Sequence, residues 1–132
     1  MPTISIITPA YNCEKYLEEA VESVLAQTMQ DWEMLIIDNC SSDNTYDCME
    51  KLAQRDKRIR IFRNIQNTGA AATRNYGIRQ AKGQWIAFLD SDDLWRTDKL
   101  QKQRKLLDKY PEASFYLPDL PSSKDDGMTI AH

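Results

Sequence analysis

The sequence predicts a three-layer α/β fold, an open sheet of mainly parallel strands with helices on both faces. Apolar runs of strand length recur along the 132 residues, and segments with helical periodicity separate them. Strands and helices that alternate in this way form βαβ units with right-handed crossovers. Polar clusters also follow the strands directly, at the edge where open α/β sheets bind ligands.

Four apolar runs are the predicted strands, namely residues 4–8, 32–37, 59–62 and 85–89. The first is expected to stop at Pro9, which lacks a backbone donor, and the second ends at Asp38. The third alternates like a half-exposed strand. The fourth is apolar throughout, as in a buried central strand.

Four segments carry the periodicity of helices. The first shows one apolar face, formed by Leu17, Ala20, Val21, Val24 and Leu25. The second has such a face over residues 45–53, formed by Thr45, Cys48, Met49, Leu52 and Ala53. The third is expected from Gly69 or Ala70 to Ala81, with Gly83 as its C-terminal stop. The fourth is expected over about 97–110.

Composition places the chain among ordinary globular domains, with 42% hydrophobic and 28% charged residues. The net charge of −3 gives no support to a nucleic-acid or anionic-membrane partner. No apolar stretch reaches the length of a transmembrane span, and no signal peptide leads the chain. Three cysteines without metal-ligand spacing suggest a reduced compartment. We therefore expect a cytoplasmic protein, with peripheral placement at the inner face of the membrane as an alternative.

The helical and strand pattern covers residues 1–110, which we predict to be one domain. Residues 111–132 contain prolines and a polar run without an apolar face, and we expect an irregular or truncated C-terminal tail there. Residues 115–117 could form one more strand.

The acidic cluster after the fourth apolar run is the strongest functional signal. Asp90, Asp92 and Asp93 fall within four positions, and like charges at contact distance resist joint ionisation without a cation or solvent. Hard oxygen ligands on a short loop suit Mg²⁺ or Mn²⁺, ions that often bring substrate phosphates with them. The alternative is a solvated acidic turn that caps the next helix.

Polar clusters follow two other strands as well, at residues 8–12 and 38–39. All strand carboxyl ends lie at one edge of a parallel sheet, so the three clusters should converge there. Their convergence favours a ligand site over three unrelated turns.

Several motifs resemble the family 2 glycosyltransferases, nucleotide-sugar enzymes of the Rossmann-like GT-A fold. They are TPAYN, SVLAQT, IIDNCSSDNT and NTGAAATRNYGI leading into FLDSDDLW. The resemblance covers roughly residues 3–110 in matching order and spacing. It implies the nucleotide-sugar-binding half of a GT-A domain.

The resemblance assigns roles at the acidic cluster. Asp90-Ser91-Asp92 looks like the family's Asp-x-Asp motif, in which Asp92 would ligate Mn²⁺ or Mg²⁺. Asp90 would lie toward the ribose or the water shell of the metal, and Ser91 would line the donor site. Asp93 could equally cap the following turn. Arg74 could reach the diphosphate or orient the acidic cluster, and the two roles stay open.

The resemblance also assigns a nucleobase pocket. Its wall would consist of Pro9, Ala10 and Tyr11, with Thr8 supplying backbone contacts. Tyr11 could instead pack under the first helix. Asp38-Asn39 stands where the family usually carries two acids, one of which accepts from the pyrimidine N3–H. The Asn39 amide can still accept that bond, but it also offers a donor.

The resemblance implies metal-dependent transfer of a sugar from a nucleotide-diphosphate-sugar to an acceptor hydroxyl, with inversion at the anomeric carbon. The expected donor is a UDP-sugar, and the acceptor of the full enzyme would be a glycan or a lipid-linked sugar. The general base is not found in this sequence, so we expect the 132 residues to bind a donor without transferring its sugar. The alternative function is a non-catalytic nucleotide-binding module.

Overall fold

The computed structural model describes residues 2–109 and 128–130. Its strands are β1 (Ile4–Ala10), β2 (Trp32–Asp38), β3 (Ile59–Arg63), β4 (Trp85–Phe88) and β5 (Met128–Ile130). Its helices are α1 (Leu17–Leu25), α2 (Thr45–Arg55), α3 (Ala70–Gln80) and α4 (Lys99–Lys109). None of these helices is both long enough and apolar enough to span a bilayer.

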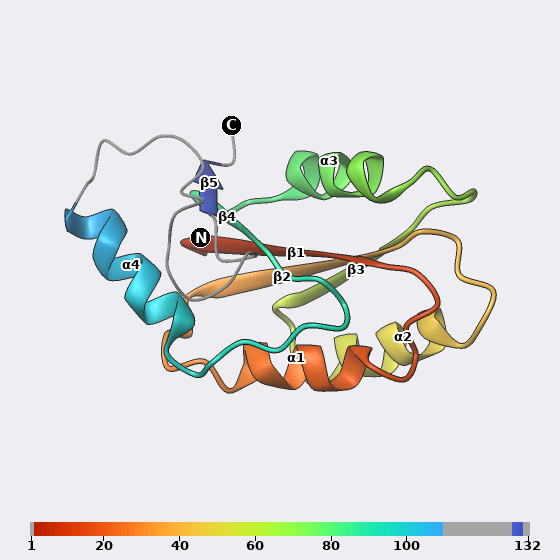
Figure 1. Ribbon diagram of the computed structural model, residues 1–132, viewed down its shortest axis with the longest axis horizontal. Coiled ribbons are helices and arrows are strands. Elements are labelled where there is room, and N and C mark those ends of the chain that lie inside the picture. Colours follow the sequence, from red (N-terminus) through yellow and green to blue (C-terminus); the bar gives the residue numbers. More distant parts are fainter. Residues whose placement is uncertain (1, 110–127, 131–132) are drawn as a thin grey trace.

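One sheet organises the molecule, with strand order β3-β2-β1-β4-β5. The first four strands are parallel, and β5 pairs antiparallel with β4. Figure 1 shows α3 on one face of the sheet and α1 and α2 on the other. The predicted three-layer open sheet of mainly parallel strands is therefore confirmed.

The two faces of the sheet pack separate apolar layers. The larger layer lies under α1 and α2 and includes Ile6, Met34 and Trp32, while Ile7, Leu35, Ile37 and Ile86 form the smaller one under α3. Gly77 lets α3 approach this second layer closely, because a Cβ there would lie 2.7 Å from Ile7 Cγ2. Residue alternation along each strand thus fixes which side chains meet which helices.

The prediction that Pro9 ends the first strand is wrong, since β1 continues to Ala10 and pairs Pro9 with Ile37. The backbone of Ile7 faces β4, because its carbonyl accepts from Leu89 N. Pro9 lies two residues further on and so faces the same side, beyond the last β1–β4 pair at Phe88. Its missing N–H therefore removes no bond of the sheet.

Gly83 has a different role from the predicted helix stop. Helix α3 ends at Gln80, and Gly83 has no left-handed backbone conformation. A Cβ at this position would lie 2.8 Å from Ser5 N and 2.9 Å from Ile4 C. Glycine is needed here because the chain passes directly against the backbone of β1.

The chain after β4 also departs from the prediction. Helix α4 begins at Lys99, later than expected, because the residues before it are hydrogen-bonded to the connection between α1 and β2: Thr28 N donates to Thr97 O at 2.8 Å. Strand β5 lies within the segment expected to be irregular, and three residues are too few to show a periodicity. The suggested strand at 115–117 lies outside the described residues.

Candidate nucleotide and metal site

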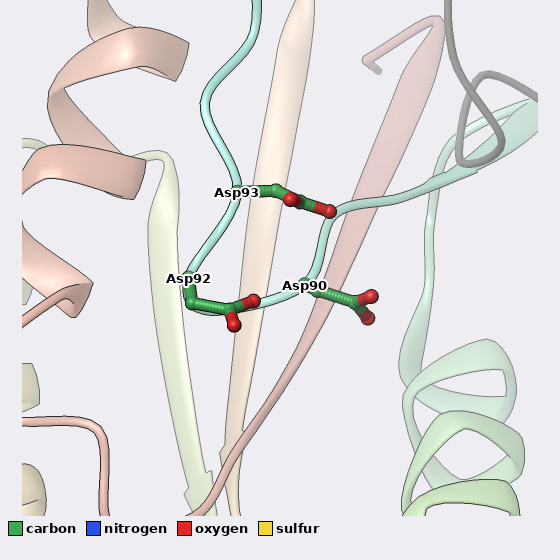
Figure 2. A group of neighbouring side chains, drawn as sticks. All are labelled: Asp90, Asp92 and Asp93. Carbon is green, nitrogen blue, oxygen red and sulfur yellow. The ribbon is translucent and has the colours of Figure 1, made fainter.

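The acidic loop brings three carboxylates together, as Figure 2 shows. One oxygen from each of Asp90, Asp92 and Asp93 lies within 4.8 Å of the others. The loop is a tight turn, closed by the hydrogen bond from Asp93 N to Asp90 O at 3.0 Å. Asp92 is exposed and its two neighbours are half-buried. Helix α4 starts only at Lys99, so this turn does not cap it.

The donor set fits a hard divalent cation. Carboxylate oxygens are the ligands that Mg²⁺ and Mn²⁺ prefer, and the exposed Asp92 leaves one side of the loop accessible to solvent. A cation would also relieve the repulsion among three converging carboxylates. The residues that the sequence proposes as metal ligands, Asp90 and Asp92, lie close enough for one oxygen of each to contact the same ion.

Arg74 brings a positive charge to this edge of the sheet. It stands in α3, and its Nη2 lies 3.3 Å from Asp90 Oδ1. Both side chains are more than one third exposed, so the ion pair is open to solvent and to a ligand. The contact places Arg74 beside the acidic cluster, and its two expected roles, binding the diphosphate and orienting the cluster, stay predictions.

Asp38 ends β2 in the interior and is fully buried. Its Oδ1 accepts hydrogen bonds from Ser41 N at 3.1 Å and Ser41 Oγ at 2.5 Å. Its Oδ2 lies 3.4 Å from Arg63 Nε, at ion-pair distance but without a hydrogen bond among the described residues. The carboxylate thus holds the turn after β2, and Arg63, which sequence reasoning missed, balances its charge.

Hydrogen bonds join the loops that follow β1 and β2. Asn12 adopts a left-handed backbone (φ 48°), its N–H donates to Ser41 Oγ at 2.9 Å, and its Oδ1 accepts from Ser42 N at 2.9 Å. Asparagine tolerates this conformation better than most residues. These contacts join two loops about 30 residues apart, and sequence alone gave no sign of their partners.

Thr45, at the start of α2, forms hydrogen bonds to both of these loops. Its Oγ1 accepts from Cys13 N at 2.9 Å and donates to Asp43 Oδ1 at 2.5 Å. Slight desolvation raises the pKa of Asp43, but the hydrogen bonds from the Thr45 side chain and backbone outweigh it, and the net pKa is lowered. Burial raises the pKa of the Cys13 thiol, which also contacts Ser91 in the acidic loop.

The predicted nucleobase wall divides into buried and exposed members. Thr8 and Ala10 are buried, Pro9 is half-buried, and the Thr8 Oγ1 has no partner among the described residues. Tyr11 is 51% exposed. The alternative in which Tyr11 packs under the first helix is therefore wrong, and the ring is free to cover a planar ligand.

Asn39 and Trp95 have positions that sequence did not predict. Asn39 is buried, and both ends of its side-chain amide bond to the β3–α3 connection through Asn64, Asn67 and Thr68. Trp95 belongs to the larger apolar layer and is only 8% exposed.

A parallel sheet whose carboxyl edge carries a carboxylate loop and an arginine has its polar groups where open α/β sheets bind their ligands. The model of the family described as glycosyl transferase family 2 matches residues 5–129. The chain belongs to this family.

Curated relatives agree with this membership. TuaG of Bacillus subtilis (strain 168), a glycosyltransferase named for teichuronic acid biosynthesis, is 45% identical over 106 residues, which are 80% of this chain and 42% of TuaG. WfgD of Escherichia coli, named as a UDP-Glc:α-D-GlcNAc-diphosphoundecaprenol β-1,3-glucosyltransferase, is 43% identical over 79% of this chain and 40% of its own length. The chain thus spans about two fifths of the length of these relatives.

Solved structures share the fold. S. aureus TarS in complex with UDP has a TM-score of 0.77 at 29% identity, over 83% of this chain and 33% of that one. The mannosyltransferase PcManGT of Pyrobaculum calidifontis, in complex with GDP-Man and Mn²⁺, has a TM-score of 0.75 at 25% identity, over 80% and 32%. The predicted GT-A class is confirmed.

Proposed function

We propose that these residues form the donor site of a metal-dependent, inverting glycosyltransferase that uses a nucleotide-diphosphate-sugar. The observation that carries the proposal is the meeting of Asp90, Asp92, Asp93 and Arg74 at the carboxyl edge of the sheet. Family membership supports the reaction class, and the length of the relatives leaves room for an acceptor-binding part beyond the aligned residues.

Asp92 and Asp90 would hold Mn²⁺ or Mg²⁺ together with the donor diphosphate. When bound, the ion supplies Lewis-acid stabilisation of the charge that develops on the departing nucleoside diphosphate. Arg74 adds a second positive group beside Asp90, and Ser91 lines the same loop. The Mn²⁺ complex of the mannosyltransferase supports a divalent ion in this fold.

The half-exposed Tyr11 would cover the nucleobase, with Pro9 and Ala10 beneath it and the Thr8 backbone at the edge. Asp38, whose Oδ1 accepts hydrogen bonds from Ser41, would support this pocket from inside. A UDP-sugar is the proposed donor, supported by the UDP complex of TarS and the UDP-Glc in the name of WfgD.

The acceptor would be a hydroxyl of a glycan or a lipid-linked sugar, as in the name of WfgD. Such an acceptor would bring the enzyme to the cytoplasmic face of a membrane. No residue of the described part of the chain is assigned as the general base. We expect the 132 residues to bind the donor without acceptor-dependent transfer, because base catalysis and acceptor positioning supply large rate factors.

Calorimetric titration with UDP tests the donor site. We expect tighter binding with Mn²⁺ than with EDTA in the wild-type chain, and loss of this difference in Asp92→Asn. The control is Glu50→Gln, which removes an exposed carboxylate on α2, outside the acidic loop. Equal affinities with and without metal in the wild type would refute the metal–diphosphate assignment.

A further inference from the structure

Both the oxygen and the nitrogen of the Asn39 side-chain amide form hydrogen bonds to the connection between β3 and α3. Its Oδ1 accepts from Thr68 N at 2.9 Å and from Asn64 Nδ2 at 3.2 Å. Its Nδ2 donates to Asn67 Oδ1 at 3.1 Å. The residue is only 6% exposed, so its amide is directed into the chain.

Backbone groups fix the orientation of both amides. Thr68 N–H can only donate, so the Asn39 atom that faces it must be the oxygen. Gly69 N–H likewise donates to Asn67 Oδ1 at 3.0 Å, so the Asn67 oxygen cannot exchange places with its nitrogen without losing that bond. An aspartate at position 39 would therefore set a carboxylate oxygen against the Asn67 oxygen, acceptor against acceptor.

These contacts continue into the first turn of α3. Asn64 Nδ2 also lies 3.2 Å from Thr73 Oγ1, and that hydroxyl donates to Gly69 O at 2.8 Å. Gly69 is the N-cap residue, with a left-handed backbone (φ 89°). Arg74 follows Thr73 in this helix and reaches Asp90. We name the side-chain amides of Asn39, Asn64 and Asn67 the amide clasp. The amide clasp thus holds the start of the helix that carries Arg74.

We propose that Asn39 is a positioning residue. Through the amide clasp it fixes the β3–α3 connection and the place of Arg74 beside Asp90, and its side chain does not read the nucleobase. This inference rests on the proposed function of this edge as a nucleotide site. It replaces the expectation that the Asn39 amide accepts from the base, because its acceptor already holds Thr68 N and Asn64.

The variant Asn39→Asp separates the two roles. A base reader that gains the family's acid should bind UDP and TDP, whose bases both carry the pyrimidine N3–H, better relative to GDP. The clasp predicts instead that affinities for UDP, TDP and GDP all fall by a similar factor, on the order of tenfold, with their ratios unchanged. A sharper preference for UDP and TDP over GDP in Asn39→Asp would overturn the inference.

The double variant Asn39→Asp/Asn67→Ala provides the matched test. Removing the opposing oxygen of Asn67 should relieve the acceptor–acceptor contact, so the double variant should bind like Asn67→Ala alone. Strictly additive losses would contradict the clasp. Because Asn67→Ala adds no charge, it keeps the test available if Asn39→Asp fails to fold.

NMR of the nucleotide-free chain distinguishes failure of this inference from failure of the proposed function. In Asn39→Asp the amide of Thr73 and the side-chain Nε–H of Arg74 should shift, whether or not the wild type binds UDP. A wild type that binds no nucleotide would refute the proposed function alone. Unchanged Thr73 and Arg74 signals in Asn39→Asp would refute the clasp.

Discussion

Arg74 offers a direct distinction between a structural ion pair and a ligand-binding group. In the free chain its only described ionic partner is Asp90, at 3.3 Å, and the two side chains are 39% and 38% exposed. Solvent-exposed pairs of this kind contribute at most about 1 kcal/mol to folding. We therefore expect Arg74→Gln to lower the free energy of unfolding by no more than about 1 kcal/mol.

The loss of diphosphate binding should be larger. A charge-assisted hydrogen bond contributes roughly 1.5–3 kcal/mol, which corresponds to a 10- to 150-fold change in Kd. Arg74→Gln should raise the Kd for UDP in Mn²⁺ by a factor in this range. The matched control is Arg79→Gln, an exposed arginine near the end of the same helix, which should leave the Kd unchanged.

Titration calorimetry gives the Kd, and urea denaturation gives the free energy of unfolding of the same samples. An unchanged Kd in Arg74→Gln would refute the contact with the diphosphate. A loss of several kcal/mol of stability would show that Arg74 supports the fold, and the reasoning from its exposure would then be wrong.

Three further predictions follow from other contacts. Gly83→Ala should cost about 1–3 kcal/mol of stability in urea denaturation, because the added Cβ meets the β1 backbone, which cannot move aside as a side chain can; a cost near zero would contradict this close approach. Mass spectrometry after brief iodoacetamide treatment should find the exposed Cys40 labelled long before the buried Cys13, whose pKa is raised by burial, and equal rates would contradict the packing of Cys13. The side-chain hydrogen bond from Arg58 lowers the pKa of Asp56 below its unfolded value of 3.8. The ionised Asp56 therefore stabilises the fold above pH 3.8, and this stabilisation is lost as the pH falls through the folded-state pKa. Asp56→Asn should therefore cost about 1–3 kcal/mol at pH 7 and progressively less on acidification, whereas a cost independent of pH would exclude this linkage.

Much of the fold could be predicted because its signals are local. Apolar runs and helical faces mark β1–β4 and α1–α4, and a parallel sheet then brings the polar strand ends to one edge. The family resemblance left two roles open for Arg74, and the structure adds that its guanidinium lies 3.3 Å from Asp90. The three-residue β5 carries no comparable pattern, and its pairing with β4 depends on the tertiary structure.

The contacts that shape the site could not be predicted because their partners lie far apart in the sequence. The ion pair of Asp38 with Arg63 and the bond from Asn12 N to Ser41 join separate loops, and no spacing rule selects these partners. Gly83 illustrates the same limit, since a glycine after a helix usually suggests a cap, yet its reason here is the backbone of β1.

Paramagnetic broadening by Mn²⁺ is the most direct test of the central claim, that a divalent ion and a diphosphate bind together at the acidic loop. In the presence of UDP, substoichiometric Mn²⁺ should broaden the amide signals of residues 91–93 first, along with the phosphorus signals of the nucleotide. Signals near Asp31 and Asp56, which lie by the starts of β2 and β3 at the opposite edge of the sheet, should stay sharp. Broadening centred on those acids, or equal broadening throughout the chain, would contradict the assignment.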